Sequence, residues 1–341
     1  MRIICLLSSL ILLTISGIGQ ALPEPPLASP VQVGFYLPGV IAPRDYANPG
    51  FSGIFAFDYN LFFRADEYID RNENAVNSVD FVGQLGSVPI NVDISSYLNA
   101  LLIGYSSPEI PWLGNARYLA LLSPYYSTID IRASYSLITQ ETTIKQNTGG
   151  FGDFMVTPIL LSWALEDKVD ITTGYYFTVP TGRYETGADN NIGLGYWNHV
   201  FQLFGYYYPF NTQKATAFFI GNSIEMHSDI KDVNVRPGSR FSLEYGISHY
   251  LHPRWEVFIQ GGNIWQISAD SGSDVYWDTS VKDRFSNVGG GVGFWPVPGK
   301  FYANLKYMNS YGESQHFNTR FWGIELQWIP WIRTKTNKPQ S

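Results

Sequence analysis

Apolar and polar side chains alternate along most of this chain with a period of two, the pattern of strands that have one apolar face. From residue 149 to residue 331 the alternation predicts nine strands of about 12 to 17 residues, longer than the roughly 5–6 residues of an average globular strand. Their connections switch strictly between short and long. The short ones are 166–167, 209–213, 252–253 and 297–299, and the long ones are 181–191, 228–238, 269–283 and 310–317. Tight turns at one end and longer loops at the other are typical of outer-membrane β-barrels.

Three further strands are predicted upstream, at residues 51–64, within 78–105 and within 115–138, followed by an external loop near 139–148. The total of about twelve is even and leaves both chain ends in the periplasm, as expected of bacterial barrels. About fourteen is the alternative, because each of the two long segments can hide a hairpin. The sequence therefore predicts an all-β fold, a transmembrane antiparallel up-and-down β-barrel of about 12 strands.

Composition favours a sheet in contact with lipid. Aromatic residues make up 16% of the chain and charged residues only 15%, whereas soluble domains have about a quarter of their residues charged. No segment after the N-terminal region is apolar enough for a spanning helix, and in lipid only helices and closed barrels satisfy every backbone polar group. A soluble extracellular β-sandwich that binds a ligand also alternates, and it remains an alternative.

The two ends of the chain differ from the barrel. Residues 1–21 combine a positively charged start, a short apolar run and a small-residue cleavage site, so they predict a cleaved signal peptide and export to the bacterial outer membrane. Removing them removes Cys5, the only cysteine. Residues 22–50 are rich in proline and predict an irregular periplasmic lead or plug segment. The predicted barrel covers 51–331, and a polar C-terminal tail covers 332–341.

Charge and residue types argue against several functions. Losing Arg2 with the signal peptide changes the net charge from −7 to −8, and an acidic chain without a basic stripe argues against nucleic acid as a partner. The chain has no G-x-S-x-G motif and no spacing typical of a metal site, so we predict no enzyme activity, no cofactor and no metal. A barrel enzyme acting on lipid remains an alternative, because serine and histidine on adjacent strands can be distant in sequence. The histidines are His199, His227, His249, His252 and His316.

One block of the sequence is more specific than the rest. It runs from Gly150-Phe151-Gly152-Asp153 through Pro180-Thr181-Gly182-Arg183-Tyr184 to Asn191, Gly193 and Tyr196-Trp197. With these motifs the chain resembles the MetA-pathway of phenol degradation family of outer-membrane barrel proteins, over roughly residues 40–331. The resemblance implies transport of hydrophobic or aromatic small molecules across the outer membrane. The residues of the block are expected to shape a hairpin or, alternatively, to contact the substrate.

The more polar face of each strand is expected to line the lumen. The candidates are Asp58, Asn60, Arg64, Tyr176, Glu244, Phe258, Gln260, Asn304, Lys306 and Glu325. A barrel of about 12 strands has a narrow lumen, and mixed aromatic and polar side chains favour a hydrophobic or amphipathic solute. Together with the resemblance, this predicts an outer-membrane channel for passive uptake of small hydrophobic or aromatic compounds. Its expected partners are that solute, outer-membrane lipid and lipopolysaccharide, and the outer-membrane assembly machinery.

Overall fold

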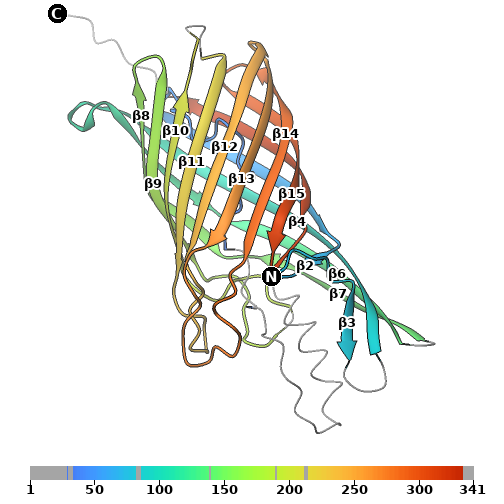
Figure 1. The fold of residues 1–341 in the computed structure, drawn as a ribbon. Helices are drawn as coiled ribbons and strands as arrows, with labels where there is room; N and C mark the ends of the chain where they lie inside the picture. Colours follow the sequence, from blue (N-terminus) through green and yellow to red (C-terminus); the bar gives the residue numbers. More distant parts are fainter. Residues whose placement is uncertain are drawn as a thin grey trace, which may run out of the picture.

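The chain forms an antiparallel β-sheet that closes on itself (Figure 1). Within the described residues, no helix is long and apolar enough to cross a membrane. The predicted signal peptide and nearly all of the predicted tail lie outside the described residues. The computed structural model describes residue 29 and residues 34–81, 86–137, 140–188, 190–210 and 214–332.

The wall of the barrel is built from strands that follow the chain order. Two wall strands are interrupted: β5 and β6 are separated at Pro124, and β7 and β8 at Gly152 and Asp153. The strands are β1 (Gly53–Ala65), β4 (Gly86–Ile110), β5 (Ala116–Ser123), β6 (Tyr125–Leu137), β7 (Gln140–Phe151), β8 (Phe154–Leu165), β9 (Val169–Val179), β10 (Asn198–Tyr207), β11 (Thr216–His227), β12 (Arg240–His252), β13 (Trp255–Gln266), β14 (Arg284–Val297), β15 (Phe301–Ser314) and β17 (Arg320–Ile332).

The first and last wall strands close the barrel. β1 pairs with β17 on one side and with β4 on the other, where its register runs without a break from Gly53 opposite Ser106 to Ala65 opposite Ile94. The described residues therefore contain a closed barrel of twelve wall strands, which confirms the fold predicted from sequence. Short turns gather at the top of Figure 1 and long loops at the bottom. We call these the periplasmic end and the external end, following the loop asymmetry of such barrels.

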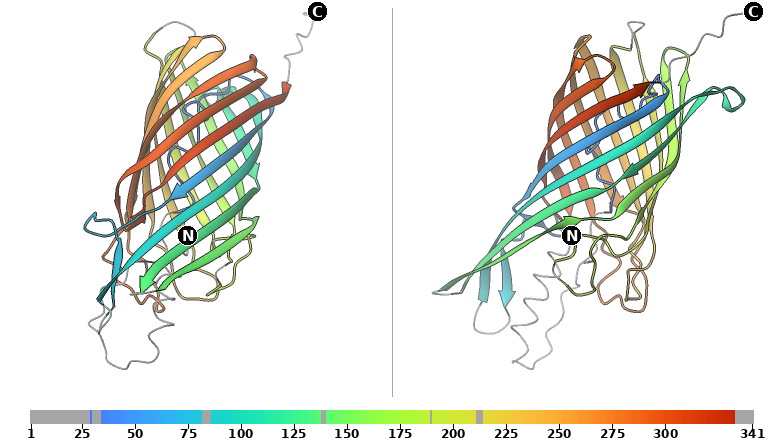
Figure 2. Two further views of the ribbon diagram at one scale, coloured as in Figure 1. Left: turned by 90° about the vertical axis from the view of Figure 1, so that its right-hand side faces the viewer. Right: turned by 180° about the vertical axis from the view of Figure 1, so that it is seen from behind.

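Part of the wall continues beyond the external rim. β4, β6 and β7 project from the barrel as a ribbon (Figure 2). The external loop expected near 139–148 is therefore wrong, because β7 pairs with β6 over this region. Its residues are polar on both faces, which suits a strand that leaves the apolar band. A short strand β3 (Ser78–Phe81) pairs with β4 outside the closed wall.

Two small elements lie outside the wall strands. β2 (Tyr68–Ile69) and β16 (His316–Phe317) pair with each other at the external end. The 3-10 helix η1 (Pro111–Leu113) forms the connection between β4 and β5 at the other end.

From β10 to β15 the wall has the usual orientation, and we call this region the conventional wall. Large apolar side chains such as Leu203, Ile220 and Leu305 point outward and are exposed, as lipid contact requires. Polar side chains alternate with them and point inward, where they are buried. Among these are Ser223, Glu225, Ser242, Glu244, Gln260 and Lys306.

The opposite orientation is found in β1 and the part of β4 that pairs with it, which we call the inverted wall. Here Phe55, Tyr59 and Leu61 point inward and are buried, while Phe62 is 47% exposed on the outside. The prediction that Asp58, Asn60 and Arg64 face the lumen is therefore wrong, because they share the outer face with Phe62. The orientation of β1 is reversed because its apolar face packs against a segment of the chain that lies inside the barrel and includes Val40 and Ile41.

Residues 34–50 of the proline-rich lead lie inside the barrel, and we call them the plug. Upstream of the plug, the Ser29 hydroxyl donates to Asp270 in an external loop, at 2.5 Å. Near the plug's end, the Asn48 side chain donates to the carbonyl oxygen of Ser162, close to the periplasmic turn between β8 and β9. The plug therefore passes along the whole interior before the chain enters the wall as β1.

Candidate solute-binding site

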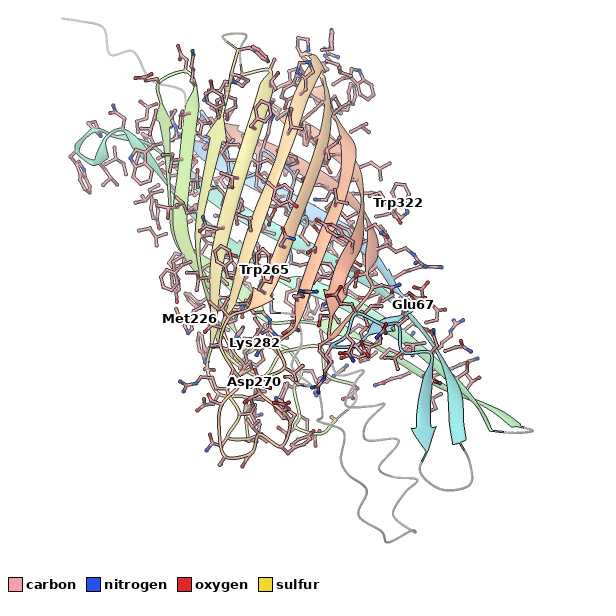
Figure 3. The ribbon with its side chains drawn as sticks, viewed as in Figure 1. Glu67, Met226, Trp265, Asp270, Lys282 and Trp322 are labelled. Carbon is pink, nitrogen blue, oxygen red and sulfur yellow. The ribbon has the colours of Figure 1, made fainter. Side chains whose placement is uncertain are left out.

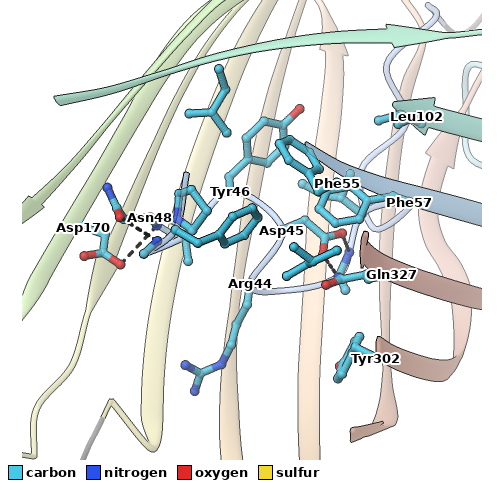
Figure 4. A pocket seen from close by; sticks show the side chains of 18 of the residues that line it. Arg44, Asp45, Tyr46, Asn48, Phe55, Phe57, Leu102, Asp170, Tyr302 and Gln327 are labelled. Atoms are coloured by element: carbon cyan, nitrogen blue, oxygen red, sulfur yellow. Dashed lines mark hydrogen bonds between the residues drawn. The ribbon is translucent and has the colours of Figure 1, made fainter. Parts of the chain in front are cut away.

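A cavity of about 520 Å³ lies between the plug and the wall strands β1, β4, β5 and β8, toward the periplasmic end (Figure 4). Its floor is formed by plug residues from Ile41 to Gly50, and its roof by inward side chains of β1, β4, β5 and β8. A volume of this size is within the range of small-molecule sites in proteins. The cavity is therefore the leading candidate for a solute-binding site.

The wall side of the cavity is apolar. Phe55, Leu119, Leu121 and Leu160 form one buried cluster, although they come from three different wall strands. On the plug side, the ring of Tyr46 stacks on another aromatic ring of the interior, Phe204, with centroids 4.3 Å apart and planes 12° apart. Removing apolar surface from water at such walls stabilises a bound solute by about 25 cal/mol per Å².

Charged groups surround the periplasmic end of the cavity, and they are paired. Arg44 of the plug donates from Nε to a carboxylate oxygen of Glu256 at 3.0 Å, and its guanidinium lies 4.7 Å from the centre of the Tyr250 ring. Nearby, Lys214 Nζ lies 2.7 Å from Asp170 Oδ1. The Arg44–Glu256 pair holds the plug to the conventional wall, and the Lys214–Asp170 pair joins two neighbouring parts of the wall beside it. Both pairs leave the apolar side of the cavity free of charge.

A carboxylate of the plug crosses to the other side of the barrel. Asp45 accepts hydrogen bonds from the Tyr59 hydroxyl and from Gln327 Nε2, both at 2.8 Å (Figure 4). Its third donor is the backbone N–H of Ala42, at 2.5 Å. Asp45 therefore fixes the turn of the plug between β1 and β17, beside the cavity.

One buried acceptor of the cavity wall has no protein partner among the described residues. Gln202 points inward from β10 and is 4% exposed, and its side chain hydrogen-bonds the Tyr46 hydroxyl. Its Oε1 accepts no hydrogen bond from the described residues. A buried acceptor left without a donor costs about 1–3 kcal/mol, so a solute that brings a donor to this oxygen gains binding energy there.

In the external half of the barrel, polar side chains of the conventional wall hold the plug. Gln260 Nε2 donates to the carbonyl oxygens of Gly39 and Ile41, at 2.9 and 3.0 Å. Lys306 donates to the carbonyl of Val40. Gly39 has a φ of +83°, a conformation that side-chain-bearing residues rarely adopt. The plug backbone is thus bound by the wall where an open channel would hold water.

The remaining predicted lumen residues are also buried inside. Glu244 accepts a hydrogen bond from the Tyr36 hydroxyl, and Asn304 donates to Glu325 at 2.7 Å. Tyr176 packs in an aromatic cluster with the plug, and Phe258 is buried on the inner face of β13. Of the predicted set, only the three residues of β1 lie on the outer face.

The predicted motif block forms a clamp at the external rim. The buried carboxylate of Asp153, at the bend between β7 and β8, accepts from the backbone N–H groups of Gly182 (2.9 Å) and Leu194 (2.7 Å). Gly182 and Gly193 touch, since a Cβ on Gly182 would lie 2.7 Å from the Cα of Gly193. The clamp thus folds the loop between β9 and β10 onto the wall.

The other residues of the block support the same loop. Asn191 bonds the backbone of Glu185 in both directions, and the Thr181 hydroxyl accepts from the N–H of Phe154. Tyr196 is buried, whereas Trp197 is 42% exposed on the outer surface. Gly150, Gly152, Pro180 and Tyr184 lie at the strand ends and in this loop. None of these residues lines the cavity, so the geometry favours the hairpin-shaping role.

In the part of the chain that the structure describes, the hydrogen bonds of the histidine Nδ1 and Nε2 atoms do not join a histidine to a serine, as a lipid-hydrolysing barrel would need. His199 bonds the hydroxyl of Tyr175, His249 that of Thr216, and His227 the carboxylate of Glu225. His252 Nδ1 accepts a backbone N–H, and His316 Nδ1 bonds a backbone carbonyl. Among the described residues, no three histidine, cysteine or acidic side chains gather as a metal site.

Several residues that line the cavity were not predicted from the sequence. Arg44 and Asp45 lie in a segment without periodicity, and Leu119 and Leu160 read as ordinary strand residues. The available signal was the pair of opposite charges in an otherwise proline-rich and apolar lead. A charged pair in such a segment indicates partners inside a fold rather than lipid or open solvent.

Residues 77–322 match the protein family described as "Putative MetA-pathway of phenol degradation". Among solved structures, an outer membrane channel from Pseudomonas putida F1 is similar, with a TM-score of 0.63, 14% sequence identity, and coverage of 84% of this chain and 99% of that one. The transport unit of the autotransporter AIDA-I from Escherichia coli has a TM-score of 0.46 and 8% identity, over 80% of this chain and 89% of that one. No curated protein sequence matches significantly. The first likeness shows the fold.

Proposed function

The chain belongs to the MetA-pathway of phenol degradation family, and from this premise we propose that it is an outer-membrane channel for the passive uptake of small hydrophobic or aromatic compounds. The observation that carries the proposal is the cavity of about 520 Å³. Its apolar side is made by inward-pointing apolar side chains of β1, β5 and β8, which an aqueous pore does not require. The closed barrel and the family description support an outer-membrane location.

In this proposal the solute rests in the cavity with its apolar body against Phe55, Leu119 and Leu160. A hydroxyl or amine on the solute donates to Gln202 Oε1, the buried acceptor of the wall. The cavity therefore favours solutes that combine an apolar ring or chain with one donor. Phenol fits this description, and toluene is its counterpart without the donor.

The plug determines passage. It is bound along its length by wall residues such as Gln260, Lys306 and Glu256, so flux requires part of it to move. Deleting residues 34–47 is expected to raise the single-channel conductance in planar bilayers several-fold. An unchanged conductance would show that the plug is not the barrier to flux.

The direct test of the proposed function fills the cavity. Leu119→Trp replaces an aliphatic side chain on the apolar side of the cavity with a bulkier indole ring. It is expected to reduce uptake of radiolabelled phenol into proteoliposomes at least ten-fold. The matched control is Leu203→Trp, which adds the same ring on the lipid-facing side of β10. Equal uptake by both variants and the unaltered chain would refute a passage through this cavity. A heat-dependent gel shift confirms that each variant is folded.

A further inference from the structure

A second hollow lies on the outside of the barrel, away from the plug and its cavity. It has a volume of about 560 Å³ and extends along the outer faces of β15, β17, β1, β4, β6 and β7. Phe62, Tyr97 and Trp322 contribute outward-pointing rings, and Figure 3 shows Trp322 directed away from the barrel. The hollow is concave because β4, β6 and β7 bend away from the barrel toward the external end (Figure 2). We call it the outer groove.

The outer groove lies at the external edge of the apolar band. On β17 the outward residues Leu326 and Ile324 are followed toward the external end by Trp322 and then by Arg320. The sequence of aliphatic, aromatic and charged side chains marks the level where the hydrocarbon core ends and the headgroups begin. Since this is the long-loop end, the headgroups at this level are those of the outer leaflet.

The groove is lined by aromatic side chains toward the middle of the barrel and by cationic side chains toward the external end. Phe62 and Tyr97 lie 5.1 Å apart, and Tyr307 and Trp322 lie 4.9 Å apart, measured between ring centroids. Next to these rings on the external side is Arg64, whose guanidinium forms no ion pair with the side chains that the structure describes. Arg320 stands beside it and pairs with Asp66 at 2.6 Å. Two guanidinium groups at one site match a phosphate, which they bind with paired hydrogen bonds.

Polar side chains continue the site toward the barrel's middle. Asn99 donates to Asp58 at 2.6 Å, and the Tyr97 hydroxyl donates to Asn60 at 2.7 Å, all on the outer face of the inverted wall. These groups lie level with Ile324 and Leu326 of the neighbouring strand. A carboxylate on a lipid-facing surface is unfavourable, so this face is suited to a ligand with hydrogen-bonding groups rather than to bare acyl chains.

We propose that the outer groove binds lipopolysaccharide, the phosphorylated glycolipid of the outer leaflet. Its phosphate lies against Arg64 and Arg320, its sugar rings lie over the aromatic side chains, and its acyl chains follow the aliphatic side chains of β15 and β17. Charge complementarity selects this occupant, because the only unpaired charge that the described groove residues present at headgroup level is positive. The bound lipid covers the part of the outer surface where Asp58, Asn60 and Asn99 interrupt the apolar side chains.

The test measures binding to the full-length mature barrel, refolded without lipopolysaccharide. Deep-rough lipopolysaccharide is titrated against it in mild detergent and followed by native mass spectrometry. The same glycolipid after enzymatic removal of its phosphates, and vesicles of phosphatidylglycerol, are the comparison probes. The expected result is one tightly bound lipopolysaccharide per barrel, at least ten-fold weaker binding after phosphate removal, and at least ten-fold weaker binding of phosphatidylglycerol.

Variants locate the site. Arg64→Gln is expected to weaken lipopolysaccharide binding about ten-fold, and Phe62→Ala is expected to weaken it as well, without changing phenol uptake. The matched control is Arg236→Gln, an exposed external-loop arginine distant from the groove in the fold. Equal affinities of Arg64→Gln and Arg236→Gln would overturn the proposal. So would phosphatidylglycerol binding that is as tight and as dependent on Arg64. Because uptake is measured separately, a failure here leaves the proposed channel function intact.

Discussion

The inverted wall and the conventional wall belong to one barrel but direct their apolar faces to opposite sides of it. In β11 of the conventional wall, Ile220 faces outward and Glu225 inward. In β1 of the inverted wall, Asp58 faces outward and Leu61 inward. Two antiparallel strands of one sheet thus present opposite faces to lipid. The hydrophobic face of a barrel strand therefore points toward its apolar packing partner, which is either lipid or a segment inside the barrel.

The plug explains the difference. Its backbone carbonyls and N–H groups need partners, and polar side chains of the conventional wall provide them. The cavity has apolar neighbours on β1, β5 and β8. Apolar side chains of the plug pack both against β1 and against β10 and β11 of the conventional wall. We call the polar side chains of the conventional wall that bind the plug backbone the polar half of the interior, and the apolar side of the cavity the apolar half.

The largest expected effect concerns the polar half. Lys306 is 1% exposed, bonds the plug, and lies near the buried carboxylates of Asp45 and Glu325. Lys306→Met leaves those carboxylates without their cation, so the free energy of unfolding should fall by about 3–5 kcal/mol. Urea titration followed by the heat-dependent gel shift measures it. Lys300→Met, in an exposed turn, is the control and should change little. Equal midpoints for the two variants would contradict a polar half that depends on charge.

The next effect compares the outer faces directly. Ile220→Lys puts a charge on the lipid face of the conventional wall, which should cost about 2–4 kcal/mol in the free energy of unfolding. Asn60→Lys puts the same charge on the inverted wall beside Asp58, where it should cost about 1 kcal/mol or less. The same urea titration in lipid bilayers separates them. Similar losses in the free energy of unfolding would mean that the outer faces of the inverted and the conventional wall are equally exposed to acyl chains.

The strand count was predictable because it depends on local signals. Alternation and connection length can each be read from a short stretch of sequence, and they predicted the barrel and its end-to-end asymmetry correctly. The orientation of β1 was not predictable, because alternation defines two faces without saying which one is inward. β1 has one almost wholly apolar face, with Phe55, Leu61 and Phe63, and such a face suits lipid as well as an apolar interior. Only packing against the plug decides between them.

The candidate site shows the same limit. Asp153 was identified within a motif, but its partners Gly182 and Leu194 are brought to it only by the fold. Arg44 and its partner Glu256 are separated by more than half the chain. Contacts of this kind depend on the path of the plug, and an irregular segment carries no periodicity from which that path can be inferred.

A smaller effect tests the apolar half through selectivity. Gln202→Leu keeps the size of the side chain and removes the acceptor, so phenol should bind about five- to ten-fold more weakly, which corresponds to about 1 kcal/mol. Toluene, which has no donor, should bind unchanged or slightly better. Isothermal titration with both solutes provides the comparison. Ser223→Ala on the neighbouring strand changes a buried hydroxyl outside the cavity and serves as the control. Equal losses for the two solutes would indicate a general disturbance instead of a lost hydrogen bond.

The smallest effect uses pH, because the polar and apolar halves differ in their titratable groups. His316, in β16 at the external end, packs on Phe285 with ring centroids 4.7 Å apart, and burial lowers its pKa below 6.5. The folded state therefore holds this histidine neutral, while the unfolded chain takes up a proton below about pH 6.5. Stability from this group is complete above that pH and declines as the pH falls through it. His316→Phe keeps the ring packing, so its unfolding midpoint should change less between pH 7.5 and 5.5 than that of the unaltered chain. The apolar wall should contribute nothing to the difference, so an identical pH dependence in both proteins would show that His316 is already charged in the folded barrel.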